Sequence, residues 1–209
     1  MTLASTPQTA IRRNPTLADL VARSRVTDAV LVVGFALLTA LAAQITIPLG
    51  FTPVPITGQT FAVLLAGATL GAARGAASQG LYVVLGAVGL PFYAEGAGGW
   101  TEATGSTAGY LVGFVIAAAV VGHLAERGQD RRISTAIPAF VAGTMIIYTL
   151  GAGWLARSLD VPVTAAAGEP SAIAYGVAPF IVGDLAKAVL AGVLLPTCWQ
   201  LFGRESDRP

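Results

Sequence analysis

Long apolar segments alternate with short polar ones along most of the chain. A helix needs about 20 mostly apolar residues to cross roughly 30 Å of hydrocarbon. Six candidate spans are 29–47, 61–73, 76–90, 108–124, 136–155 and 177–201. The second and third are short and separated only by Arg74 and Gly75. We interpret them as a tight helical hairpin, because one continuous helix would bury Arg74 at the bilayer centre. The pattern predicts an all-α membrane protein with six transmembrane helices.

Basic residues are unevenly distributed among the expected loops. With the N-terminus inside and six spans, ten of the twelve Lys and Arg residues fall on the cytoplasmic side, and Arg157 alone lies in an outer loop. Cytoplasmic loops of membrane proteins collect Lys and Arg, so this topology is favoured over one with five spans. We therefore expect a multi-pass protein of the cell membrane with both termini cytoplasmic. The expected division is a tail over 1–27, a transmembrane domain over 28–202 and a tail over 203–209.

The composition argues for contact with the lipid bilayer and against several other functions. Hydrophobic residues make up 55% of the chain and charged residues 11%, whereas about 25% is usual in globular domains. The net charge of +1 gives no reason to expect nucleic acid as a partner. The single His123 lacks neighbours at metal-ligand spacing, and neither a phosphate-binding GxxxxGK[ST] run nor a G-x-S-x-G motif occurs. We expect no cofactor, no metal and no catalytic residue.

Small residues recur every four positions in two of the expected helices. Gly67, Gly71 and Gly75 show this spacing in and just after the second span, and Ala36 and Ala40 show it in the first. In lipid, such spacing lets two helix backbones approach closely. The simplest interpretation is that these residues pack helices within the chain.

Two opposite charges interrupt the last apolar segment. Asp184 and Lys187, the only lysine, are three residues apart and therefore neighbours on one helix face. A charged residue inside a span costs about 2.5–3.5 kcal/mol on insertion scales, so such residues normally face a polar interior and serve a function. We predict that both bind a ligand. The alternative is an ion pair that only stabilises helix packing.

The two outer loops that flank the short helical pair are unusual. The segment 48–60 is uncharged and carries three prolines, which impose extended backbone on the residues before them. It can fold over a cavity and expose the Thr57 hydroxyl and the Gln59 amide to a ligand, or it can be a plain rigid turn.

The second outer loop, 91–107, combines several glycines with aromatic and acidic side chains. Mobile backbone with aromatic residues is typical of a lid that closes over a ligand. Its candidate ligand-binding residues are Tyr93, Glu95 and Trp100.

Polar and aromatic side chains on the helices complete a predicted pocket that faces outward. The candidates are Gln79, Tyr82, Tyr110, Tyr148 and Trp154. Tyrosine and tryptophan also serve as anchors at the membrane interface, and that alternative stays open. Together with the charged pair, these groups suit a small amphipathic ligand that has a carboxylate and a polar ring.

Four motifs in this order resemble one known family. They are V-P-I-T-G-Q-T at 54–60, L-G-A-V-G-L-P-F-Y-A at 85–94, T-A-G-Y-L-V-G-F at 107–114 and P-F-I-V-G-D-L-A-K at 179–187. The chain resembles the BioY family over roughly 29–201. Members of that family are the biotin-specific S components of energy-coupling-factor (ECF) vitamin transporters.

The resemblance implies an S-component-like bundle of six helices that captures biotin from outside as its transported ligand. It implies as partners a transmembrane coupling subunit and two ABC-type ATPases, which would hydrolyse ATP in place of this chain. Asp184 and Lys187 match the family's ligand-binding element, and Ala36 and Ala40 match its coupling-subunit contact. A carboxylate can accept ureido N–H groups, and an ammonium can pair with the valerate carboxylate.

Three other functions remain to be weighed. The first is an S component for another vitamin, such as thiamin or riboflavin. The second is an intramembrane enzyme that uses Asp184 and Lys187 as acid and base. The third is a structural subunit without a ligand, in which the two charges pair only with each other.

Overall fold

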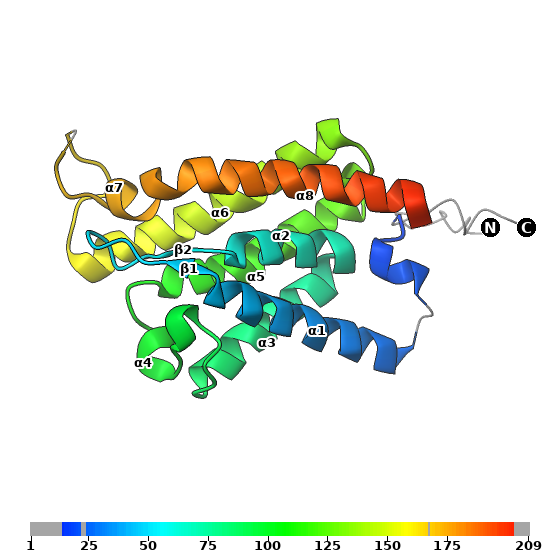
Figure 1. Ribbon diagram of the computed structural model, residues 1–209, viewed down its shortest axis with the longest axis horizontal. Coiled ribbons are helices and arrows are strands. Elements are labelled where there is room, and N and C mark those ends of the chain that lie inside the picture. Colours follow the sequence, from blue (N-terminus) through cyan, green and yellow to red (C-terminus); the bar gives the residue numbers. More distant parts are fainter. Residues whose placement is uncertain (1–13, 22–23, 167, 203–209) are drawn as a thin grey trace, which may run out of the picture.

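The computed structural model describes residues 14–21, 24–166 and 168–202. Most of these residues form helices that run roughly along one direction of an elongated bundle (Figure 1). The longer helices are α1 (Arg25–Gln44), α2 (Gln59–Leu70), α3 (Ala72–Ala87), α5 (Ala108–Ala125), α6 (Ile133–Leu159) and α8 (Ile181–Phe202). Two short ones, α4 (Trp100–Ala103) and α7 (Ala172–Gly176), lie at one end of the bundle.

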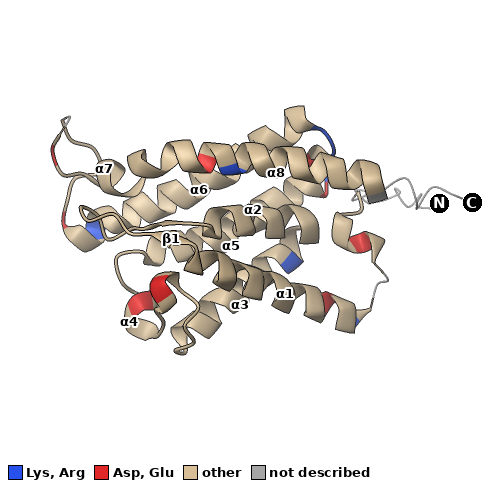
Figure 2. Cartoon of the chain, viewed as in Figure 1, with Lys and Arg blue, Asp and Glu red and all other residues tan. Residues whose placement is uncertain are grey.

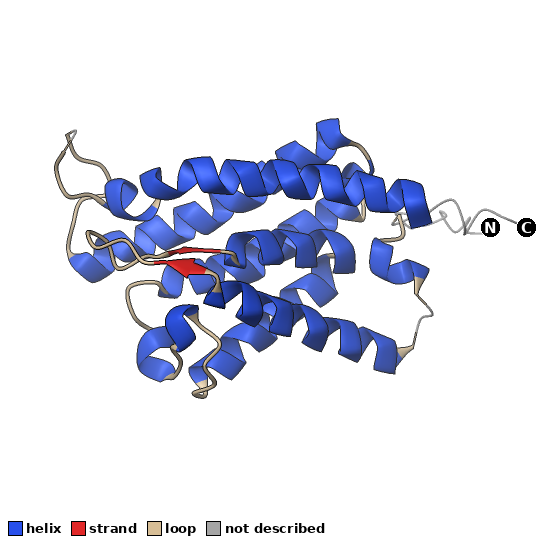
Figure 3. Ribbon diagram, viewed as in Figure 1, coloured by secondary structure: helices blue, strands red, loops and turns tan. Residues whose placement is uncertain are grey.

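Short elements complete both ends of the bundle. Strands β1 (Thr46–Ile47) and β2 (Ile56–Thr57) pair antiparallel at the end that carries α4 and α7 (Figure 3). Single turns of 3-10 helix occur at Leu17–Leu20, Ala94–Gly96, Gln129–Arg131 and Ala178–Phe180. The most extensive helix contacts are made by α5, which packs against α6, α2 and α3. The centre of the bundle is therefore built around α5.

The prediction of an all-α membrane protein is confirmed. Four segments are long and apolar enough to cross a membrane: Arg25–Gln44, Ala108–Ala125, Ile133–Leu159 and Ala172–Leu201. Helices α2 and α3 have 12 and 16 residues, or about 18 and 24 Å at 1.5 Å per residue. Both are shorter than a standard span, so the expected count of six crossings stays a prediction.

The break between the two short helices differs from the expected one. The chain bends at Gly71, whose φ of +85° favours glycine, and Arg74 lies inside the first turn of α3. The Glu126 carboxylate accepts a hydrogen bond from the Ala72 backbone N–H at 3.0 Å and so caps the start of α3. Arg74 is thus at a helix end, where its charge is accommodated.

Arg74 connects α3 to the start of α1 and to the residues before it. Its guanidinium pairs with Asp28 on α1 and with Asp19, both at 2.8 Å, and donates to the Thr16 hydroxyl at 3.2 Å. The segment that carries Thr16 and Asp19 belongs to the expected N-terminal tail. Part of that tail is therefore bonded to the bundle, at the end opposite to α4 and α7.

Small residues pack helices together as expected. A Cβ added at Gly67 would lie 2.5 Å from the Ala118 carbonyl oxygen, so α2 and α5 touch backbone to backbone. Ala36 is fully buried and Ala40 is 7% exposed, in one apolar cluster with Tyr82 of α3. These two alanines contact other helices of this chain because the small-residue face of α1 turns inward. The expected contact of these two alanines with a coupling subunit stays a prediction.

Candidate functional site

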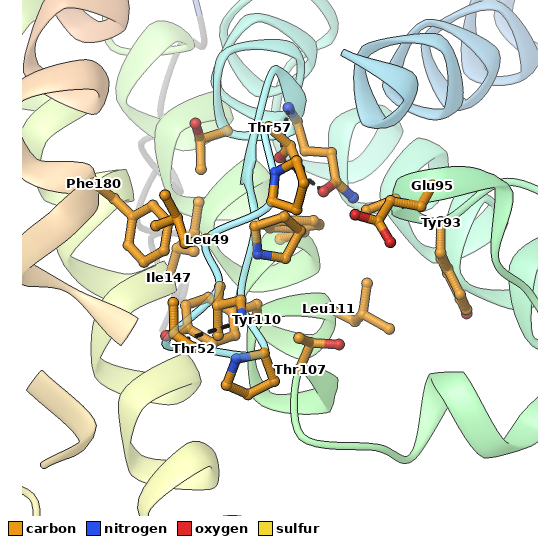
Figure 4. Close-up of a pocket in the computed structure, with 18 of the residues that line it drawn as sticks. Leu49, Thr52, Thr57, Tyr93, Glu95, Thr107, Tyr110, Leu111, Ile147 and Phe180 are labelled. Atoms are coloured by element: carbon orange, nitrogen blue, oxygen red, sulfur yellow. Dashed lines mark hydrogen bonds between the residues drawn. The ribbon is translucent and has the colours of Figure 1, made fainter. Parts of the chain in front are cut away.

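A cavity of about 410 Å³ opens at the end of the bundle that carries the two strands. Its walls come from the connection between α1 and α2, the segment that leads into α4, and helices α5, α6 and α8 (Figure 4). Apolar lining side chains include Leu49, Leu111, Phe114, Ile147 and Phe180. A cavity of this size that mixes apolar, aromatic and a few polar groups is typical of a small-molecule binding site.

Asp184 and Lys187 form an ion pair at the cavity wall. The ammonium nitrogen of Lys187 lies 2.6 Å from Oδ1 of Asp184. Asp184 is only 4% exposed, and its other oxygen, Oδ2, accepts a hydrogen bond from the Tyr148 hydroxyl at 2.8 Å. The aspartate lies in the first turn of α8, where the partial positive charge of a helix N-terminus stabilises a carboxylate.

The ion pair also fixes the connection between α1 and α2. Lys187 donates to the Thr57 carbonyl oxygen at 2.6 Å and to the Thr60 hydroxyl at 3.2 Å, and Thr60 donates to Asp184 Oδ1 at 2.9 Å. All three ammonium hydrogens therefore have acceptors. The start of α2 and the first turn of α8 are held together by charge-assisted hydrogen bonds, which are the stronger kind.

The connection between α1 and α2 is a proline-containing hairpin that covers the cavity. Gly58 allows a close approach to α1, since a Cβ there would lie 2.9 Å from the Ala42 carbonyl oxygen. Thr52, near the tip, donates its hydroxyl to the Tyr175 carbonyl oxygen at 2.8 Å and so ties the hairpin to α7. Its backbone conformation therefore depends on contacts that are far apart in the sequence.

Thr57 and Gln59 lie where the hairpin enters α2, and both line the cavity. The Thr57 hydroxyl donates to Oε1 of Gln59 at 2.8 Å, and the Gln59 amide donates to the Tyr82 hydroxyl at 2.6 Å. Tyr82 is fully buried and does not line the cavity. It supports the Gln59 side chain from behind.

Tyr93 and Glu95 form the opposite wall, in the segment before α4. The Tyr93 hydroxyl donates to the Val83 carbonyl oxygen at 2.7 Å, and burial raises the pKa of this phenol above its ordinary value. Its backbone carbonyl accepts from the Gln44 amide of α1 at 3.0 Å. Glu95 has φ of +61°, which is uncommon for a residue other than glycine.

Tyr110 of α5 also lines the cavity and donates to the Gly176 carbonyl oxygen at 2.7 Å.

The structure brings together seven of the ten side chains that the sequence assigned to a ligand. They are Thr57, Gln59, Tyr93, Glu95, Tyr110, Asp184 and Lys187.

The other three lie outside the lining. Gln79 is buried between α3 and α1, where its amide donates to the Thr39 hydroxyl at 3.1 Å. Tyr82 is one layer behind the wall, and Trp100 is 73% exposed on α4. Tyr148, considered among the helix candidates, lines the cavity, whereas Trp154 bonds to the Gly105 carbonyl oxygen elsewhere.

Sequence reasoning missed two kinds of lining residue. Thr60 stands within the T-G-Q-T run directly after Gln59, and its polar side chain was a usable signal. The apolar residues Leu49, Phe114 and Phe180 gave none, because side chains that face lipid, core and ligand are equally apolar in a transmembrane helix.

The chain is similar to known proteins over most of its length. The family model described as "BioY family" matches residues 13–204. The "Biotin transporter BioY" of Rhodobacter capsulatus is 42% identical over 171 residues, which cover 79% of this chain and 88% of that protein. The protein of the same name from Rhizobium etli is 39% identical over 166 residues, covering 76% and 85%.

The fold is similar to a solved structure. The "S-component for biotin from an ECF-type ABC transporter" superimposes with a TM-score of 0.74, covering 86% of this chain and 95% of that one, at 24% identity. This likeness confirms the S-component-like arrangement of the helices. By the extent of the family match and the identity to its members, the chain belongs to the BioY family.

Proposed function

We propose that this protein captures biotin at the outer face of the cell membrane and takes part in its uptake. The observation that carries the proposal is the cavity whose wall holds the Asp184–Lys187 pair. Its volume and its mixture of polar and apolar groups fit a small amphipathic molecule. Relatives named biotin transporters, at about 40% identity, support biotin as that molecule.

The orientation in the membrane follows from the charges. Arg157 lies in the last turn of α6, which leads to α7 at the cavity end, whereas Arg25 begins α1, Arg74 lies in the first turn of α3 and Arg131 lies between α5 and α6, toward the other end. Because basic residues collect on the cytoplasmic side, the cavity opens outward in this topology. Six crossings, with α2 and α3 as two short spans, keep both ends of the chain inside.

We propose that partner subunits supply the energy for uptake by this protein. The sequence has no phosphate-binding GxxxxGK[ST] run. We therefore assign ATP hydrolysis to two ABC-type ATPases, joined through a transmembrane coupling subunit, as the family resemblance implies. Contact of the coupling subunit with Ala36 and Ala40 on α1 stays a prediction.

The competing functions fit the geometry less well. An acid and base for catalysis exchange protons with the substrate, whereas Asp184 and Lys187 are paired with each other and further bonded to Thr57, Thr60 and Tyr148. A purely structural subunit has no need of a cavity beside that pair. Thiamin or riboflavin is an alternative in ligand identity only.

A binding screen tests the proposal directly. The purified protein is titrated by calorimetry with biotin, thiamin and riboflavin. We expect saturable binding of biotin, at least a hundredfold tighter than binding of either other vitamin. Tighter binding of thiamin or riboflavin would reassign the ligand. Failure of all three to bind, in protein that remains folded, would remove the proposed function.

A further inference from the structure

The cavity differs in charge between its floor and its mouth. The deep part of the cavity wall, called the floor below, holds the ion pair of Asp184, which is 4% exposed, and Lys187, whose side chain is 22% exposed, and the two charges cancel. The mouth holds Glu95 and Glu102, two exposed side chains that line the same cavity. Within 14–21, 24–166 and 168–202, no hydrogen bond or ion pair engages the side-chain carboxylate of Glu95 or of Glu102. Lys187 is the only cation in the lining, against three carboxylates.

The floor is already satisfied and electrically balanced. Asp184 accepts from Lys187, Thr60 and Tyr148, and Lys187 also donates to the Thr57 carbonyl oxygen. A ligand carboxylate placed here would add an uncompensated negative charge to a buried site, which is costly. A neutral ureido ring has both donors and acceptors and can join these hydrogen bonds without changing the charge. The structure therefore favours the ring at the floor.

With the ring at the floor, the valerate tail points to the mouth and meets Glu95 and Glu102. Figure 4 shows the Glu95 side chain extending from its loop toward the connection between α1 and α2, across the cavity. The left-handed backbone conformation of Glu95, with φ of +61°, sets the direction in which its side chain projects from the loop. Figure 2 shows that acidic residues gather on and beside α4. A free carboxylate at the end of the tail is repelled there, and a neutral or cationic end is not.

We propose that this protein binds biotin amides, with a neutral or cationic tail, at least as tightly as free biotin. Glu95 and Glu102 set this preference by their negative charge at the mouth of the cavity. The inference rests on the proposed function, because it assumes that the biotin ring occupies the floor. It differs from the expectation, drawn from residue types alone, that Lys187 pairs with the valerate carboxylate.

Three probes that differ in tail charge test the proposal. They are biotin, biotinamide and N-(2-aminoethyl)biotinamide, with tail charges of −1, 0 and +1. Calorimetry on the wild type is expected to give the tightest binding for the amine and the weakest for the acid. In the double variant Glu95→Gln with Glu102→Gln, we expect the ratio of the acid and amine dissociation constants to fall at least tenfold. Salt near 1 M, where the Debye length is about 3 Å, reduces the wild-type ratio in the same direction.

A matched control separates local charge from net charge. Glu169 is an exposed glutamate in the loop between α6 and α7, at the same end of the bundle but outside the cavity lining. Glu169→Gln is expected to leave the ratio unchanged. An unchanged ratio in the double variant, or amides that bind the wild type more than tenfold weaker than biotin, would overturn the inference while biotin binding stands. If none of the three probes binds the wild type, the proposed function itself fails.

Discussion

Removal of the Lys187 ammonium separates a binding role for the pair at the cavity wall from a packing role. In the structure this ammonium donates to Asp184 at 2.6 Å, to the Thr57 carbonyl at 2.6 Å and to the Thr60 hydroxyl at 3.2 Å. A hydrogen bond that involves a charged group contributes about 1.5–3 kcal/mol. We expect Lys187→Ala to weaken biotin binding at least tenfold, about 1.4 kcal/mol.

The same substitution leaves Asp184 buried without its counter-charge. Breaking a buried pair by removing one partner costs about 3–5 kcal/mol of stability, so the variant is expected to unfold at lower temperature. A second variant, Asp184→Asn with Lys187→Ala, removes both charges and should recover most of the stability. This double variant still lacks the carboxylate and the ammonium that contact the ligand, so its affinity for biotin should stay low.

The assay is calorimetric titration together with thermal unfolding in the same detergent. Arg157→Ala serves as the control, because it removes a cation at the same end of the bundle from a residue outside the cavity lining. The reasoning is refuted if the double variant regains stability and binds biotin as tightly as the wild type does. In that case the pair would be a packing element only.

Two further predictions concern the helix contacts. Gly67→Val is expected to destabilise the protein by about 2 kcal/mol or more, because a Cβ there would lie 2.5 Å from the Ala118 carbonyl oxygen. Thermal unfolding compares it with the control Gly80→Val, where an added Cβ meets nothing within 4 Å. Equal destabilisation by both substitutions would contradict the close contact of α2 with α5. Ala36→Trp is expected to lower the unfolding temperature strongly, because Ala36 is fully buried. Leu37→Trp is expected to be tolerated, because Leu37 is 44% exposed. An unchanged unfolding temperature of Ala36→Trp would place Ala36 on the surface, where a partner helix could reach it.

The sequence predicts the helices and the charged pair well, for physical reasons. Crossing hydrocarbon requires long apolar segments, and charge inside such a segment is costly enough to be conspicuous, as at Asp184 and Lys187. The break at Gly71 was placed three residues too late, since Arg74 was taken to lie between helices. The charge of Arg74 is accommodated by ion pairs with Asp19 and Asp28, which lie about 50 positions earlier in the sequence. No local sequence pattern indicates these pairs.

The lining of the cavity is where local patterns reach their limit. Gln79 and Tyr82 are polar residues on a transmembrane helix, and the same reasoning that assigned them to a ligand fits their actual roles inside the bundle. No residue of α3 lines the cavity, because α3 packs against α1 and α5. Phe114 and Phe180 illustrate the converse, because an apolar side chain gives no sign that it faces a ligand.

A structure of the protein solved with biotin bound would show whether the cavity beside the Asp184–Lys187 pair holds the ring of biotin. We expect density for the ureido ring within hydrogen-bonding distance of Asp184 and Lys187, with the tail directed toward Glu95 and Glu102. Biotin located elsewhere, with this cavity filled by side chains or lipid, would refute the proposed site.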